Sequence, residues 1–465
     1  MNAVERLAQS HRPQDGPLRV LAASGQLGYG IPEPALRRGM VRAPHFVGCD
    51  MGSIDPGPYY LGSGMMAAPP EMVYRDLDLV LCAALGAGIP LVIGSAGTAG
   101  ARPHLQATVA VLQRIAQARG LRFRLVTVAS DMLPEQVIAA MAQGRLAPIG
   151  AIDMPSAQQV HDCSHIVGQC GTDTLVQALA LGADVVVAGR ACDTAIFAAL
   201  PVMLGYPMGL ALHMAKIIEC TSLCCVPGGR DAMLAELSMD GFTLESMNPD
   251  SHATPASVAA HALYEQADPC RVEEPEGTLL LDQARYAALD AHRTRVQGAR
   301  FVARDKPSLK VEGASLVGQR VVLLAGVADP GLLDLLPQAL AVVEQRVRTL
   351  VAGDWSVFAH IYGQGAVRPL AQGTLRAGEA GLVLEFIAPQ VVLARTAAGV
   401  FKQNLLHYGY PGRKSTAGNL AFAFTPSEVD AHAAYRFVLY HAMQDVPASG
   451  IFALNAIDVD GQPVH

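Results

Sequence analysis

The side chains with the clearest chemical potential in this sequence are two arginines and two aspartates near glycine-rich stretches. They are Arg102, Arg190, Asp55 and Asp193. An arginine fork binds a carboxylate through two parallel hydrogen bonds and so fixes its orientation. A carboxylate in a partly dry pocket can then move a proton beside the anchored group. We therefore assign the arginines to substrate binding and the aspartates to proton transfer. The alternative is that Arg190 and Asp193 form a local salt bridge that only holds their loop.

The apolar stretch from Leu210 to Cys225 carries three more ionisable side chains. His213, Lys216 and Glu219 recur every three residues, so they share one face if the stretch is helical. Ionisable groups on a buried helix must be paired or must line a cavity. We expect Glu219 or Asp193 to act as a base. Lys216 or His213 would be the complementary acid. The alternative is an internal Lys216–Glu219 ion pair that closes the end of the helix.

These side chains depend on the elements that position them, which are predicted strands followed by glycine-rich loops. The clearest strand is residues 89–93, followed by the loop 94–104. A five-residue apolar run between Gly and Pro is typical of a strand buried on both faces. Glycines in the loop let backbone amides approach a ligand. Gly97 and Thr98 are therefore candidate substrate-binding residues.

Four other predicted strands lead into similar loops. They cover residues 18–23, 45–49, 166–167 and 185–188. In a parallel sheet all five loops would leave the same edge, where the ligand sites of open α/β sheets lie. The loop after residue 49 adds Ser53 and Tyr59 to the candidate substrate-binding residues. The alternative for any one loop is a tight turn packed on itself.

Composition indicates a soluble enzyme. The chain has 465 residues, of which 51 % are apolar and 16 % charged, so it can bury a large core in two domains. A net charge of −7 without a basic cluster argues against nucleic acid or an anionic membrane as a partner. The start has no apolar signal core, and no stretch reaches the roughly 20 apolar residues of a membrane span. The expected location is the cytoplasm.

The order of the predicted elements indicates an α/β fold. Strands and helices alternate from Leu18 onward, which favours a Rossmann-like, mostly parallel sheet with glycine-rich loops at the strand ends. We expect a weakly ordered leader over residues 1–16 and a large α/β domain over 17–354. An irregular, hairpin-rich segment lies within that domain at about 226–310. Residues 355–465 are expected to form a smaller α+β domain.

The sequence argues against three other kinds of site. Cys220, Cys224 and Cys225 lack zinc-ligand spacing, and the nine cysteines are expected to be reduced. The glycines of residues 25–30 reverse the order that a dinucleotide fingerprint requires. Cys192 and Cys220 lie near His or Arg, yet no nucleophile signature surrounds them. We therefore expect no metal ion and no required cofactor.

Several motifs along the chain together resemble one protein family. They are Asp55-Pro-Gly-Pro-Tyr-Tyr-Leu-Gly62, Gly94-Ser-Ala-Gly-Thr-Ala-Gly-Ala-Arg-Pro-His104, Gly182-Ala-Asp-Val-Val-Val-Ala-Gly-Arg-Ala-Cys-Asp193, Glu219-Cys220, Val258-Ala-Ala-His-Ala-Leu-Tyr-Glu265, His360-Ile-Tyr-Gly363, Leu406-His-Tyr-Gly-Tyr-Pro-Gly412 and Ala417-Gly-Asn-Leu420. This set resembles the acyclic terpene utilisation (AtuA-type) family over essentially the whole chain from about residue 18. The resemblance implies a bacterial cytosolic protein, linked to the catabolism of branched unsaturated acids and often accompanied by a small partner protein.

Residues and resemblance together lead to one expected function. It is a catabolic lyase or isomerase that acts on a small or branched unsaturated carboxylic acid, free or as its CoA ester. The reaction would proceed by proton abstraction, as isomerisation, elimination or hydration. A hydrolase of an amide or thioester is one alternative, and a non-catalytic subunit of a multi-protein catabolic complex is another. We expect a homo-oligomer.

Overall fold

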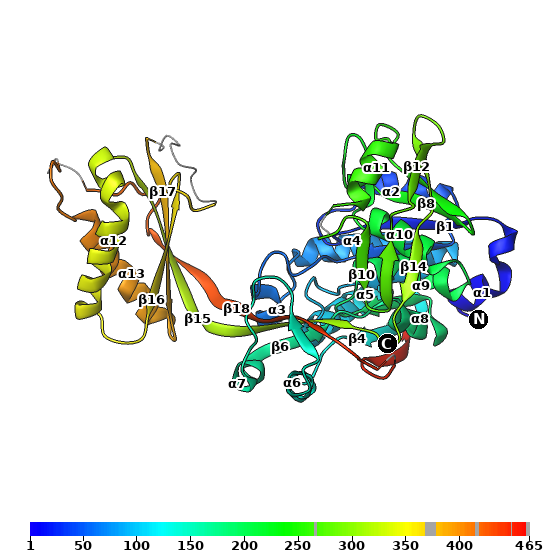
Figure 1. Ribbon diagram of the computed structural model, residues 1–465, viewed down its shortest axis with the longest axis horizontal. Helices are drawn as coiled ribbons and strands as arrows, with labels where there is room; N and C mark the ends of the chain where they lie inside the picture. Colours follow the sequence, from blue (N-terminus) through cyan, green and yellow to red (C-terminus); the bar gives the residue numbers. More distant parts are fainter. Residues whose placement is uncertain (265–266, 368–377, 414–417, 448, 462–465) are drawn as a thin grey trace. The chain divides into compact units, whose positions relative to one another are not determined.

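The computed structural model describes residues 1–264, 267–367, 378–413, 418–447 and 449–461 (Figure 1). The motif residues Glu265 and Ala417 lie outside these ranges. The chain forms two compact units, here called the large unit (Met1–Ala314 with Phe437–His465) and the small unit (Ser315–Arg436). This division differs from the expected boundary after residue 354. Two long strands, β15 (Leu309–Val327) and β18 (Glu428–Met443), each run through both units, so the small unit is inserted between them.

The large unit is built on a ten-stranded mixed sheet. In spatial order its strands are β12 (Arg285–Ala288), β13 (Arg293–Gln297), β9 (Gly241–Ser246), β8 (Met233–Ser238), β1 (Leu18–Ser24), β2 (Phe46–Asp50), β3 (Leu91–Gly94), β7 (Val185–Ala188), β4 (Arg122–Ala129) and β19 (Ala453–Asp460). The five strands from β1 to β4 in this order are parallel, and antiparallel strands extend the sheet on both sides. The α/β class is confirmed, but the sheet is mixed, so the prediction of a mostly parallel sheet is wrong.

Helices cover both faces of the parallel strands, which explains their continuous apolar sequences. Val185 and Val187 of β7 pack into one core cluster, and Val186 and Ala188 into another. Successive side chains of a strand point to opposite faces, so both faces need apolar residues. The cluster that contains Val186 and Ala188 includes residues of α8 (Thr172–Ala180), α9 (Asp193–Met203) and α10 (Met208–Ile218). The cluster that contains Val185 and Val187 includes residues of α2 (Glu33–Val41), α4 (Pro70–Ala87) and α5 (Arg102–Arg119).

Shorter elements complete the large unit. They are η1 (Pro13–Asp15), α3 (Tyr59–Ser63), α6 (Pro134–Ala142), β5 (Leu146–Pro148), α7 (Ala157–His161), β6 (Cys163–Gly168), η2 (Thr221–Cys224), α11 (Pro255–Ala262), β10 (Arg271–Glu274), β11 (Gly277–Leu280) and β14 (Arg300–Ala303). The strands β10, β11 and β14 form a separate antiparallel sheet. Among the described residues, no helix is both long and apolar enough to cross a membrane.

The first residues form a docked helix, so the expectation of a weakly ordered leader over 1–16 is wrong. Helix α1 (Ala3–Ser10) begins with a capping box in which Asn2 and Glu5 bond to each other's backbone amides. Asp184 accepts a hydrogen bond from the Ala3 amide (2.7 Å) and another from the Arg124 amide (2.9 Å). Val4 and Leu7 are buried in the core. A distant carboxylate and apolar burial thus order a segment whose local composition is polar.

The glycine-rich loop after β1 is held by a buried carboxylate on α4. Asp76 is fully buried, and it accepts hydrogen bonds from the amides of Gly28 (2.9 Å), Gly30 (2.9 Å) and Ile31 (3.0 Å). Arg75 donates to the same carboxylate (2.6 Å). These three amides are therefore occupied within the protein. The sequence had predicted that amides of this loop could approach a ligand.

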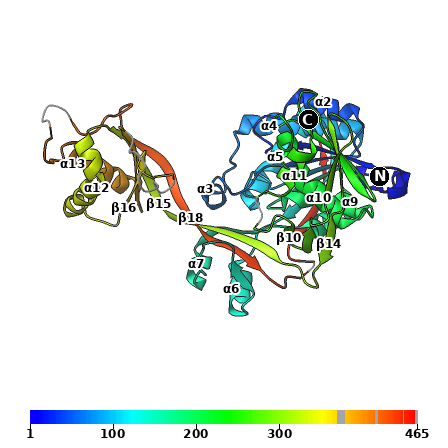
Figure 2. The same cartoon turned by 45° about the horizontal axis from the view of Figure 1, so that its top comes forward.

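The small unit packs helices α12 (Pro330–Leu350) and α13 (Val391–Leu406) on a sheet ordered β16-β17-β15-β18. Strand β16 covers Ser356–Tyr362, and β17 covers Ala380–Ala388. Figures 1 and 2 show both helices on the same face of this sheet. Leu323, Leu384 and Phe401 are buried between the two layers. The small unit therefore has a hydrophobic core of its own.

Substituting Asp76→Ala should lower the free energy of unfolding by about 3 kcal/mol or more, because three amides lose their shared acceptor. Chemical denaturation of the full chain measures this change. Asp78→Ala is the matched control, since Asp78 lies two residues further along α4 in an ion pair with the exposed Arg119. That substitution should cost at most about 1 kcal/mol. Equal losses in the two variants would contradict the role assigned to Asp76.

Candidate functional site

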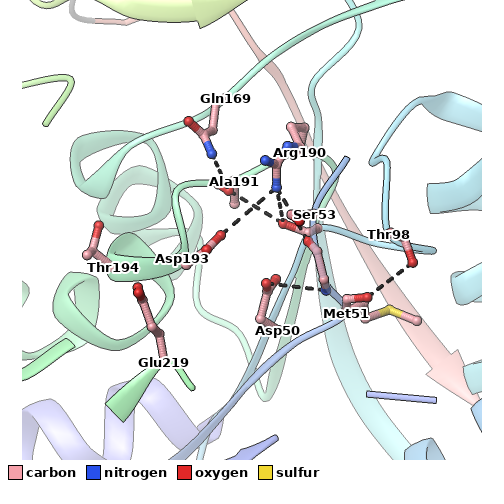
Figure 3. A network of polar contacts seen from close by, with 12 residues as sticks. Asp50, Met51, Ser53, Thr98, Gln169, Arg190, Ala191, Asp193, Thr194 and Glu219 are labelled. Carbon is pink, nitrogen blue, oxygen red and sulfur yellow. Dashed lines mark hydrogen bonds and ion pairs between the residues drawn. The ribbon is translucent and has the colours of Figure 1, made fainter. Parts of the chain in front are cut away.

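The candidate site lies where the parallel strands of the large unit end. Asp50 is the last residue of β2, Ser95 follows β3, and Arg190 comes two residues after β7. Because parallel strands end at the same edge of a sheet, these three residues meet although they are far apart in the sequence. Figure 3 shows their surroundings, with Arg190 and Asp193 pointing toward one another. This edge is where the sequence predicted a site. One of the five predicted parallel strands, residues 166–167, instead lies in β6, which pairs with β15 outside the ten-stranded sheet.

The loops after β3 and β7 touch backbone to backbone. A Cβ on Gly100 would lie 2.0 Å from the Arg190 nitrogen, and one on Gly189 would lie 2.5 Å from the Gly100 oxygen. Gly100 also has φ of 70°. Only glycine fits at such a contact. These glycines serve close packing between loops that brings Arg190 beside the loop after β3.

Two residues of the β3 loop have strained backbones. Ser95 has φ of 48° and Thr98 has φ of 87°, which is rare for a β-branched residue. The Thr98 hydroxyl donates to the Met51 carbonyl (3.2 Å), and its amide donates to the Ser95 carbonyl (2.8 Å). Gly97, with φ of 58°, lies between them and donates its amide to the Met51 sulfur (3.4 Å). Such conformations cluster at functional sites, where surrounding contacts hold them in place.

The Arg190 guanidinium is almost entirely buried and donates four hydrogen bonds. Its Nε and Nη2 donate to the two carboxylate oxygens of Glu312 on β15, at 3.0 and 3.4 Å. Its Nη1 donates to the Ser95 hydroxyl (3.1 Å) and the Gly52 carbonyl (3.4 Å). The nearest oxygen of Asp193 is 4.0 Å away. The fork that we expected to hold a substrate carboxylate therefore holds Glu312 in this structure.

Lys310 joins the same network from β15. Its Nζ lies 3.2 Å from Glu312, donates to the Tyr440 hydroxyl at 3.0 Å and lies 4.2 Å from the centre of that ring. Burial lowers the pKa of Lys310, but the charge of Glu312 and the hydrogen bond to Tyr440 together raise it above its ordinary value. Its side chain keeps 26 % of its surface exposed, whereas that of Arg190 keeps 3 %. Lys310 is thus the more accessible of these two cations.

Two aspartates beside Arg190 have raised pKa values. Burial is the main cause for both, and the negative charge of Asp193 further raises the pKa of Asp50. The charges of Arg190, Lys216 and Lys310 oppose this shift at Asp193.

The Asp193 side chain is nevertheless 38 % exposed. Its Oδ1 is buried and accepts no hydrogen bond from any described residue. This carboxylate is therefore partly reachable from solvent, and its buried oxygen faces Arg190 at 4.0 Å without accepting a hydrogen bond from the described residues. Those are the properties that a proton-transfer group needs.

The Lys216–Glu219 ion pair, which the sequence analysis gave as the alternative interpretation of the apolar stretch, is present. Lys216 is the ninth residue of α10 and donates to Glu219 just beyond the helix end, at 2.9 Å. Both are almost fully buried, and the Lys216 Nζ lies 4.8 Å from the centre of the Tyr264 ring. The charge of Lys216 acts on Asp193. The pair is therefore both an internal salt bridge and a neighbour of the proposed base.

Two further buried carboxylates lie beside α8 and α9, and the sequence analysis did not select them. Glu274 accepts a hydrogen bond from the Thr194 hydroxyl (3.0 Å), and Glu276 accepts one from the Asp173 amide (2.9 Å). Burial, with a contribution from Glu276, raises the pKa of Glu274 to about 8. Burial also raises the pKa of Glu276 to about 7. Glu219 and Asp193 add to the shift at Glu274, so these acids share one electrostatic environment.

The other candidate residues lie apart from the network or at its margin. His213 is fully buried against Phe242 and Tyr286, and burial lowers its pKa to about 3. It is therefore neutral near pH 7 and cannot serve as a proton-donating imidazolium there. Arg102 is exposed at the start of α5, and its backbone amide donates to Asp131 (2.9 Å). No hydrogen bond or ion pair among the described residues joins its side chain to the network.

The loop after β2 places its three candidates at the surface of the site. Asp55 is exposed, and its negative charge raises the pKa of Asp193. Ser53 is partly buried and accepts a hydrogen bond from the Asp55 amide (3.2 Å). Tyr59 begins α3, packs edge-on against Tyr60 and donates to the Met65 sulfur (3.5 Å). Asp55 is thus electrostatically linked to the network, whereas the contacts given above for Ser53 and Tyr59 are with residues 55–65.

Three cysteines near the site have thiols with raised pKa values. Burial raises the pKa of Cys220 to about 12 and raises those of Cys192 and Cys170 as well. A thiol with a raised pKa is a poor nucleophile near neutral pH. The described residues contain no group of three or more His, Cys, Asp or Glu side chains that could hold a metal ion.

The residues missed by the sequence analysis carry weak local signals. Glu312 and Lys310 alternate along β15, in a pattern that is equally typical of an exposed strand. Glu274 lies at the end of a short strand among other glutamates. Asp50 comes directly after an apolar run, in the same way that Asp193 comes after a glycine-rich turn. That position is the one local signal that could have selected Asp50. Burial distinguishes these residues from solvated ones, and burial depends on the tertiary structure.

Glu274 should make stability depend on pH. Its pKa is raised in the folded state from an ordinary value of 4.5 to about 8, so the folded protein holds the proton more tightly. Stability should therefore fall as pH rises through that window. Thermal unfolding at pH 5 and pH 8 measures this fall in stability. The drop in melting temperature between the two pH values should be smaller for Glu274→Gln than for the wild type. Glu273→Gln, at an exposed neighbour, should keep the wild-type loss. If Glu274→Gln also keeps it, the assigned shift is wrong.

Glu312→Ala should leave the Arg190 charge buried without its main partner. The expected loss in the free energy of unfolding is about 3–5 kcal/mol. Glu385→Ala removes a half-buried carboxylate from β17, where Arg320 and His360 are its partners, and should cost about 1 kcal/mol. Denaturant titration of both variants tests this difference. A loss for Glu312→Ala no larger than that for Glu385→Ala would contradict it.

Comparison with known proteins identifies one family. A family model described as acyclic terpene utilisation family protein AtuA matches residues 72–438. The match includes Arg190, Asp193, Glu219 and Glu312, whereas Asp50 and Asp55 precede it. Searches of curated proteins and of solved structures returned no match. The match covers well over half of the chain and agrees with the motifs quoted from the sequence. The chain therefore belongs to the acyclic terpene utilisation (AtuA) family.

Proposed function

We propose that this chain is a catabolic enzyme that transfers protons on a small or branched unsaturated carboxylic acid, or on its CoA ester. The family supports a role in the utilisation of acyclic terpenes, and hence in catabolism. The observation that carries the proton-transfer step is the state of Asp193. This carboxylate has a raised pKa, 38 % exposure and an oxygen that accepts no hydrogen bond from the described residues, and three cations act on it.

In this proposal Asp193 removes a proton from the carbon beside the carboxyl or thioester group. The C–H bond breaks, the proton goes to a carboxylate oxygen, and the electron pair moves onto the substrate carbonyl oxygen as an enolate. A base with a pKa raised toward neutrality is suited to this step, because it can both take and return the proton. Return of the proton to a different carbon gives an isomer, and loss of a β-substituent gives an elimination.

The positive charges around Asp193 have distinct roles. Lys310 is the accessible cation that would contact the substrate carboxylate or the developing enolate oxygen. Arg190 would act through its charge, since Glu312, Ser95 and Gly52 occupy its donors. Lys216, held by Glu219, would supply the complementary acid. Charge aligned before the reaction stabilises a developing oxyanion without reorganisation cost.

The cysteine-based hydrolase is the less favoured alternative. Burial raises the pKa values of Cys192 and Cys220, which opposes formation of the thiolate that such chemistry requires. A substrate that is a CoA thioester is compatible with the proposed proton transfer, in which its sulfur is not attacked. We propose no metal ion or organic cofactor for this reaction.

The proposal is tested by hydrogen exchange into candidate substrates in D₂O, followed by NMR. Thermal-shift screening of small unsaturated acids and their CoA esters first identifies a ligand. Asp193→Asn should then slow exchange by about 10²-fold or more, because the base is removed. Glu219→Gln should slow exchange less than Asp193→Asn, because Glu219 acts only by holding Lys216, the complementary acid. The wild-type rate should fall on acidification at a pH above the ordinary range of an aspartate, as Asp193 becomes protonated.

Asp240→Asn is the control, because it makes the same chemical change at an exposed carboxylate in the turn between β8 and β9. It should exchange at the wild-type rate. Exchange that is equally fast in the wild type, Asp193→Asn and Glu219→Gln would rule out this assignment of the base. Wild-type protein that binds an acid in the thermal-shift screen without exchanging it would favour the non-catalytic subunit.

A further inference from the structure

Strand β16 forms an edge of the small unit's sheet, and none of its own residues is of a kind that prevents further pairing. On one side it pairs with β17 over all seven residues without a bulge, and no described strand lies on its other side. Its sequence, Ser356-Val-Phe-Ala-His-Ile-Tyr362, contains no proline, lysine, arginine or carboxylate. A long, regular and apolar edge strand is a template for pairing with another strand.

The other edge of the same sheet differs in this respect. This edge is formed by the part of β18 that lies in the small unit. Strand β5 pairs with β18 only at residues 441–443, which belong to the large unit. The β18 edge carries Glu428, Asp430 and Arg436, and His432 has φ of 57°. Charged side chains and irregular backbone are the usual means by which proteins prevent edge pairing. One edge of this sheet is thus protected and the other is not.

The sequence of β16 is suited to pairing with a second copy of itself. An antiparallel pair centred on Ala359 would match all seven residues, whereas any other two-fold centre leaves part of the strand unmatched. In this register Val357 lies opposite Ile361 of the second copy, and Phe358 lies opposite His360. Apolar and aromatic cross-strand pairs of this kind stabilise sheets. Beyond the strand ends, Asp354 lies opposite Gln364, so no like charges face each other.

The side chains of β16 also leave apolar surface that a second copy would cover. Phe358 is 51 % exposed and Tyr362 is 49 % exposed, on the face of the sheet away from the helices. Tyr362 lies beside Gly381, which has no side chain to cover its ring. Val357 and Ile361 pack against the core of the small unit but are only partly buried at this edge. Their counterparts in a second copy would extend that core.

We propose that two copies of this chain associate through β16, antiparallel and about a two-fold axis at Ala359. The pairing would join the sheets that contain β16 in the two copies into one continuous sheet. Main-chain hydrogen bonds supply affinity in such strand addition, and the facing side chains supply register. A two-fold contact uses the same surface on both copies and closes, so it limits assembly to a dimer.

In the proposed dimer, Ala359 of one copy lies opposite Ala359 of the other copy, and the test uses this position. Ala359 is exposed, so the fold should tolerate a charged residue there. Wild-type chain should show twice the chain mass by analytical ultracentrifugation. Ala359→Lys and Ala359→Glu should each show the monomer mass, because like charges then face each other. An equimolar mixture of the two variants should recover the dimer. Ala341→Lys, at an exposed position of α12, should remain dimeric.

Three outcomes would overturn the proposal. They are a monomeric wild type across the accessible concentrations, variants at Ala359 that remain dimeric, and a mixture that stays monomeric. Circular dichroism confirms that the variants are folded. Hydrogen–deuterium exchange of the wild type gives an independent measurement. The β16 amides should become more protected as concentration rises, while those of residues 428–436 should not.

Discussion

The buried guanidinium of Arg190 is the constraint on which the functional edge of the large unit depends. A buried cation costs several kcal/mol unless its hydrogen bonds and its charge are satisfied. Satisfying it requires Glu312 from β15, Ser95 from the loop after β3 and the Gly52 carbonyl from the loop after β2. These partners are separated by up to 260 residues (52 to 312). The network thus holds together segments that sequence distance would keep apart.

The same network decides which acids near the site carry charge. Glu312 and Glu274 are both buried glutamates, yet the pKa of Glu312 is lowered and that of Glu274 is raised to about 8. Burial acts on both in the same direction, and the difference comes from Arg190 and Lys310, which lie against Glu312. Glu274 has a neutral threonine hydroxyl and another carboxylate nearby instead. Two acids of one type therefore have opposite protonation states at neutral pH, a division typical of proton-transfer sites.

The motifs that identify the family have physical explanations within this edge. Gly100 and Gly189 permit backbone contact between the loops that carry Ser95 and Arg190. Asp193 follows as the first residue of α9, and the Glu219–Lys216 pair lies beyond it. By contrast, the glycines after β1 serve a loop that Asp76 holds through three amides. Similar glycine-rich loops thus have different functions, and the surrounding contacts distinguish them.

The sequence by itself determined what depends on local pattern. Apolar runs followed by glycine-rich loops predicted the parallel strands β1, β2, β3 and β7. Three-residue spacing placed Lys216 and Glu219 on one face, with their ion pair as the alternative interpretation, and repeated loops predicted the edge where Arg190 and Asp193 lie. Only the tertiary structure decided what depends on distant partners. In the tertiary structure the Arg190 guanidinium binds Glu312, and burial lowers the pKa of His213, which is therefore neutral in the core. The small unit is inserted between β15 and β18. The physical reason is that strand and helix periodicity is a property of neighbours in the chain. Charge burial and strand pairing are settled between residues hundreds of positions apart.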